Sequence, residues 1–101
     1  MKPKTVAPTP ITQAEFLALT VNLPGSIPSL HEEREWWMSG GRLGVIVRDK
    51  FDNDWGWIAL ARNPHNSFQA YNFQVSLPTS DQARASLTTA LEANLKDGWW
   101  K

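Results

Sequence analysis

Three runs of apolar residues occupy the middle of the chain, and each is bounded by turn-forming residues. They are Leu43–Lys50, Trp55–Arg62 and Phe68–Leu77, separated by the stretches FDND and NPHNS. Runs of this length, rich in β-branched and aromatic residues and divided by short polar turns, are typical of consecutive antiparallel strands. The pattern therefore predicts a three-stranded antiparallel β-meander.

Helical spacing precedes this region. Thr12 and Glu15 form a capping box, after which apolar residues recur at helical intervals, which predicts a helix over Ile11–Leu23. A second capping box at Ser29 and Glu32 predicts another helical segment, which contains Trp36 and Trp37 and ends at Ser39-Gly40-Gly41.

A last helix follows the strands. Thr79 and Gln82 have capping-box spacing, and Gly98 is a natural end. The apolar stripe of this helix consists of Ala83, Leu87, Ala90, Leu91 and Leu95. The fold class is therefore α+β with α-β-β-β-α order, and we expect the helices on one face of the meander. Residues 1–10, with three prolines, predict a flexible leader, and residues 11–101 a single domain.

The register of the hairpins decides which residues share a face, because side chains alternate along a strand. Four-residue loops at 51–54 and 64–67 would pair Lys50 with Trp55 and Asn63 with Phe68. The core face then holds Val45, Val47, Ile58, Leu60, Tyr71, Phe73 and Val75. The opposite face holds Ile46, Arg48, Lys50, Trp55, Trp57, Ala59, Phe68, Ala70, Asn72 and Gln74.

This opposite face combines basic groups with indoles, as in cation–π pairs of Arg48 with Trp57 and Lys50 with Trp55. A sheet facing water needs no such aromatic side chains, so we expect the face to be covered. The candidates are the first helix, the Trp36-Trp37 segment, the Trp99-Trp100 tail, a homodimer or a protein partner. Tryptophan and arginine are enriched in binding hot spots. The predicted partner-binding residues are Arg48, Lys50, Trp55, Trp57, Phe68 and Asn72.

Composition narrows the function classes. The ten basic and ten acidic residues cancel, which argues against binding to phosphate by bulk electrostatics. There is no cysteine, which excludes disulfides and thiolate chemistry and favours a cytoplasmic location. No apolar run is long enough to span a membrane, so we expect no membrane partner.

The motifs that could carry chemistry all have simpler interpretations. His31 and Glu35 lack the second histidine of a metalloprotease helix, and His65 lies in a proline-containing turn. The acidic residues of 49–54 lack full calcium-loop spacing and are ordinary turn formers. We therefore predict no catalytic residue, no metal, no cofactor and no enzyme activity.

Two resemblances bear on function. The element order resembles the double-stranded-RNA-binding domain, but the final helix begins TSDQAR and lacks the lysines which that family uses. The run RLGVIVRDKFDNDWGWIALAR with VSLPTSDQAR resembles short accessory proteins of bacterial integrative elements and phages, which implies an inhibitory or regulatory role on a host system. We expect a non-catalytic protein-binding module; the alternative is a nucleic-acid-binding domain that stacks bases on the aromatic and basic sheet face.

Overall fold

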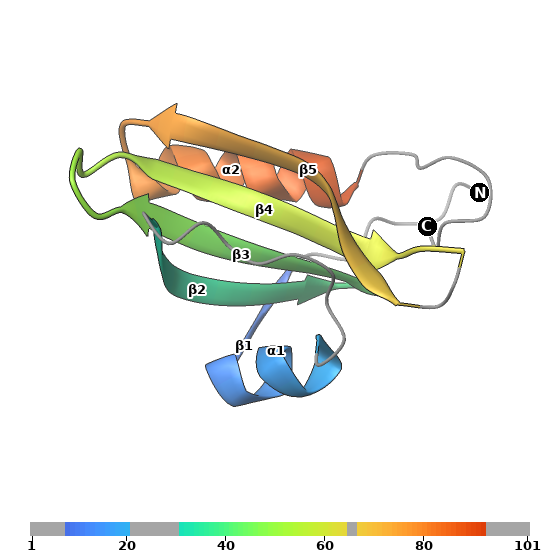
Figure 1. Cartoon of the computed structure of the whole chain (residues 1–101). Coiled ribbons are helices and arrows are strands. Elements are labelled where there is room, and N and C mark those ends of the chain that lie inside the picture. Colours follow the sequence, from blue (N-terminus) through green and yellow to red (C-terminus); the bar gives the residue numbers. More distant parts are fainter. Residues whose placement is uncertain (1–7, 21–30, 65–66, 93–101) are drawn as a thin grey trace.

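The protein folds around one five-stranded antiparallel sheet (Figure 1). The computed structural model describes residues 8–20, 31–64 and 67–92. Its elements are β1 (Thr9–Ile11), α1 (Gln13–Leu19), β2 (His31–Ser39), β3 (Arg42–Asp49), β4 (Trp55–Arg62), β5 (Phe68–Leu77) and α2 (Ser80–Leu91). Each strand pairs with the next along the chain, in the order β1-β2-β3-β4-β5. The α+β class is confirmed, whereas the predicted three strands and α-β-β-β-α order are not.

The main correction is β2, which the capping-box pattern had predicted as helical. Trp36 pairs with Val45 and lies with the residues under α1, whereas Trp37 pairs with Gly44 and packs on the α2 side. A strand can send adjacent indoles to opposite faces, but a helix cannot. Gly40, at φ 62, makes the tight turn into β3. Burial on both faces of the sheet thus overrides the local helical signal.

A short strand begins ahead of residue 11, where the domain was predicted to start. Thr9 pairs with Met38 and Pro10 with Trp37, so β1 adds a short edge strand ahead of Ile11. Proline is tolerated there because an edge strand leaves half of its backbone donors unused. Residues 1–7 of the predicted leader lie outside the described residues.

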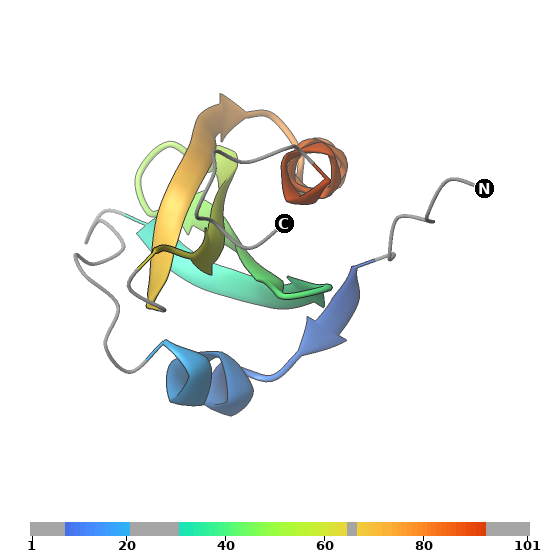
Figure 2. The same cartoon turned by 90° about the vertical axis from the view of Figure 1, so that its right-hand side faces the viewer.

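The two helices cover opposite faces of the sheet, so the prediction of helices on one face is wrong (Figure 2). Phe16 of α1 packs with Val45, Val47 and Leu60 on one side. The stripe of α2 packs on Ile46, Trp57 and Ala59 on the other. The face of Ile46 and Trp57 is covered, as expected, but by α2, which was not among the candidates considered for it.

Close packing joins α2 to the sheet at Gly44. A Cβ built on this glycine would lie 2.7 Å from Cδ1 and 2.8 Å from Cδ2 of Leu87, whose side chain is buried. Real carbon atoms do not approach so closely, so the absence of a side chain at position 44 is what lets α2 reach the sheet.

The register of β3 and β4 differs from the prediction by two residues. Arg48, rather than Lys50, pairs with Trp55, and Ile46 pairs with Trp57. The longer connection is stabilised by the carboxylate of Asp49, which accepts hydrogen bonds from the amides of Phe51 and Asp52. Because the shift is even, every residue of these two strands keeps its predicted face.

The β4–β5 hairpin contains irregularities that the sequence pattern does not reveal. The predicted pair of Ile58 with Phe73 is present, but Leu60 pairs with Ala70 instead of Tyr71. The register shifts between Ala59 and Leu60. Strict alternation along β5 therefore assigns the residues on one side of this shift to the wrong face of the sheet.

The ends of α2 are held by groups of different origin. At its start, the Thr79 hydroxyl accepts a hydrogen bond from the Gln82 amide at 3.1 Å, which confirms the predicted cap. At its end, the buried Arg42 donates to the Leu91 carbonyl at 2.7 Å, and the Tyr71 hydroxyl donates to the Ala90 carbonyl at 2.6 Å. The last turn has no basic residue of its own, so β3 and β5 supply its polar partners.

The predicted stripe of α2 is confirmed within the described residues. Its buried residues are Ala83, Leu87, Ala90 and Leu91. Leu95, Gly98 and the Trp99-Trp100 tail lie outside them. The capping box of α1 is also confirmed, since Thr12 and Glu15 exchange hydrogen bonds of 3.0 and 3.1 Å. The part of the chain that the structure describes has no helix long and apolar enough to cross a membrane.

Candidate protein-interaction surface

Trp57 was predicted to contact a partner, but it lies in the core. It is 3% exposed and packs in the cluster beneath α2 with Ile46 and Leu87. Its Nε1 has no hydrogen-bond partner among the described residues. The expectation that this indole faces outward is therefore wrong, because α2 occupies the surface to which it was assigned.

Phe68 is also buried, and on the opposite side of the sheet from its predicted position. It pairs with Arg62, whose guanidinium carbon lies 4.5 Å from the ring centroid, and its side chain joins the cluster of Phe16 and Leu60. The register shift near Tyr71 separates Phe68 from the face of Trp57. An unbroken alternation along β5 had placed both on one face.

Three more predicted partner-binding residues lie near the β3–β4 turn: Arg48, Lys50 and Trp55. The Arg48 guanidinium stands over the ring of Trp55, 5.9 Å from its centroid, and donates to the Asn53 side chain. Trp55 is half-buried against the α2 cluster, while Lys50 is exposed in the β3–β4 turn. The cation–π pair is thus Arg48 with Trp55, not with Trp57, as the two-residue register shift requires. Arg48 and Trp55 are thus neighbours across the β3–β4 ladder, whereas Lys50 lies outside it.

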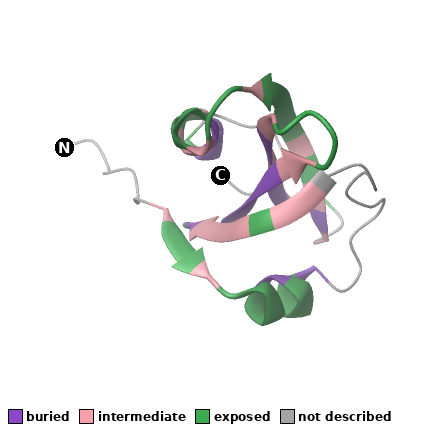
Figure 3. Cartoon of the chain, turned by 90° about the vertical axis from the view of Figure 1, so that its left-hand side faces the viewer, coloured by how far each residue is buried: buried purple, intermediate pink, exposed green. Residues whose placement is uncertain are grey.

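Strand β5 carries the most exposed apolar surface of the sheet. Phe73 is 66% exposed and Val75 is 43% exposed, although both were predicted to be in the core. Among the described strands, β5 has a neighbour on one side only, and its ten residues FQAYNFQVSL include no charge and no proline. Exposed residues occupy much of β5 in the burial view (Figure 3). Long, uncharged edges readily pair with another strand, although the two register shifts between β4 and β5 interrupt the regular part of this edge.

Asn72, a predicted partner-binding residue, lies in the middle of this edge and is exposed. Its side-chain oxygen accepts a hydrogen bond from the Phe73 amide at 2.9 Å. Half of the backbone groups of an edge strand point away from the sheet, and each one needs a partner. We therefore interpret Phe73 N–H as an outward amide that Asn72 satisfies locally.

The opposite edge of the sheet is built differently. β1 has only three residues, and one of them is Pro10. The part of β2 that β1 leaves unpaired carries Glu32, Glu33 and Arg34, with an ion pair of 3.6 Å between Arg34 and Glu32. Short strands, proline and charge are the devices by which proteins block strand pairing at an edge.

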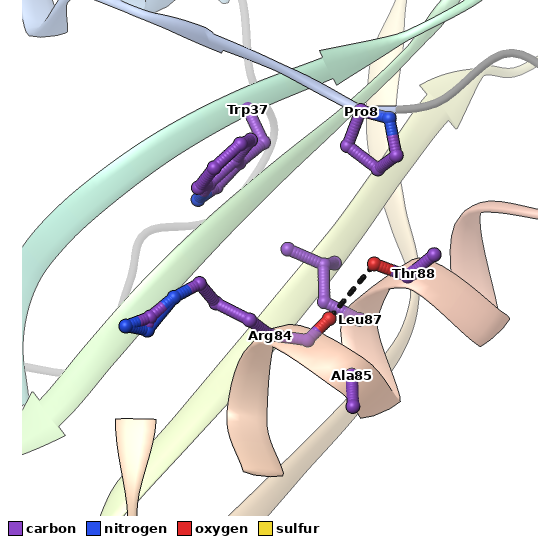
Figure 4. Close-up of a pocket in the computed structure, with 6 residues that line it drawn as sticks. All are labelled: Pro8, Trp37, Arg84, Ala85, Leu87 and Thr88. Carbon is purple, nitrogen blue, oxygen red and sulfur yellow. Dashed lines mark hydrogen bonds between the residues drawn. The ribbon is translucent and has the colours of Figure 1, made fainter. Parts of the chain in front are cut away.

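A hollow of about 220 Å³ lies between Trp37 of β2 and α2 (Figure 4). It is lined by Pro8, Trp37, Arg84, Ala85, Leu87 and Thr88. Its cation, Arg84, lies 3.4 Å from Glu35 and 3.3 Å from Asp81. The Thr88 hydroxyl donates to the Arg84 carbonyl at 2.9 Å. The polar groups of the hollow are therefore already paired within the chain.

Titratable and metal-binding groups give no sign of a reactive centre in the described part of the chain. No group of three or more histidine or acidic residues there is placed to hold a metal ion. Among the same residues the clear shift is at Tyr71, where burial raises the pKa of the phenol above its ordinary value of 10.0 and nearby Arg42 opposes the rise. This phenol belongs to the bracing of α2 described above.

Comparison of the chain with family models, with curated proteins and with solved structures finds no match.

Proposed function

We propose that this chain is a non-catalytic protein-binding module that presents the outer edge of β5 to its partner. The observation that carries the proposal is the exposure of Phe73 and Val75 on a ten-residue strand without charge. Elsewhere the two helices take up the large aromatic side chains of the sheet, including Trp57 and Phe68.

An edge of this kind recognises a partner by adding a strand. Backbone hydrogen bonds supply affinity, and side chains that alternate along the added strand supply specificity. Phe73 and Val75, two residues apart, would give the partner apolar anchors on the face opposite α2, since Phe73 pairs with Ile58 and not with the residues beneath α2. A module that occupies an edge in this way would act as an inhibitor or regulator of its partner, in the reducing cytoplasm that a cysteine-free chain favours.

Nucleic-acid binding is the weaker candidate. Two of its expected stacking side chains, Trp57 and Phe68, are buried at 3% and 6% exposure. Base stacking needs an open aromatic face and a basic groove, and the charges of the chain cancel.

Capture from cell lysate with matched variants tests the proposal. The bait is the full chain, compared with the double variant Phe73→Ser with Val75→Ser and with the control Phe51→Ser. Phe51 is 74% exposed in the β3–β4 turn, so its loss removes similar apolar surface away from β5. We expect a nuclease-resistant protein partner that is retained by wild type and the control and lost with the β5 double variant. Capture that is equal for all three baits would refute the assignment to β5.

A further inference from the structure

We draw no further inference here: the strongest candidate, the hollow between Trp37 of β2 and Arg84 of α2, carries none, because its polar groups are paired within the chain and nothing in the part of the chain that the structure describes shows what would occupy it.

Discussion

The contact between Gly44 and Leu87 allows a quantitative test of the packing of α2 on the sheet. Leu87→Ala removes a side chain that is 2% exposed and leaves a cavity, and such changes cost about 2–5 kcal/mol of unfolding free energy. Gly44→Ala adds a methyl group where Leu87 already lies, at 2.7 Å from its Cδ1. Overpacking of a core costs about 1–3 kcal/mol, of which about 0.5–1 kcal/mol is offset because alanine suits a strand better than glycine.

The two changes should compensate each other when combined. The methyl group added at position 44 would occupy part of the space that Leu87 vacates, and the same vacancy removes the clash. We therefore expect the double variant to be no less stable than Leu87→Ala alone. The coupling energy should be about 1–2 kcal/mol, in the range found for residues that share one cavity.

Urea unfolding of the wild type, both single variants and the double variant measures this cycle, with tryptophan fluorescence and circular dichroism as independent probes. Ala18→Gly combined with Leu87→Ala is a suitable control, because Ala18 is exposed on α1, on the other side of the sheet, and should add its helix-propensity cost independently. Additivity of Gly44→Ala and Leu87→Ala within about 0.3 kcal/mol would show that α2 does not seat on Gly44 as described.

Three further results are expected. Thr79→Ala should cost about 1 kcal/mol in thermal unfolding because it removes the cap on the Gln82 amide, and no loss relative to Thr89→Ala would exclude that role. Trp57→Ala should cost about 3–5 kcal/mol in urea unfolding, with Trp57→Phe clearly milder; a folded, fully stable alanine variant would contradict its burial. Because burial raises the pKa of Tyr71 above 10.0, its stabilising contribution is complete below pH 10 and is lost as the pH rises through the folded-state pKa. Ultraviolet titration of this single tyrosine should place its midpoint above 10.0, and a midpoint at or below that value would refute the burial argument.

Local signals in the sequence were sufficient for much of the fold. The limits of β4 and β5 and the caps at Thr12 and Thr79 follow from turn residues, β-branched runs and capping boxes, all of which act over a few residues. The faces of β3 and β4 were also correct despite the wrong loop length, because an even shift in register preserves them.

The errors arose where contacts between residues far apart in the sequence determine the local structure. A helical capping pattern precedes β2 in the sequence. Its two adjacent tryptophans fit a strand because α1 covers one face of the sheet and α2 covers the other. The register shift near Tyr71 depends on the fit of β5 to β4 and has no signature in the alternation.

The prediction of the candidate interaction surface had the same limitation. Phe73 and Val75 are exposed but had been assigned to the core, because alternation cannot tell an edge strand from a central one. The sequence does show that β5 has no charge. That absence indicates an edge able to pair with another strand only once β5 is known to be the outermost strand.

The bracing of the last turn of α2 has a consequence for the order of folding. Its carbonyls are satisfied by Arg42 of β3 and Tyr71 of β5, which are 49 and 19 residues away from Leu91 and Ala90 along the chain. A twelve-residue helix is marginal by itself in water, and this one has no basic residue in its last turn. The C-terminal turn of α2 is therefore expected to become stable only after β3 and β5 have assembled, which makes its docking a late event in folding.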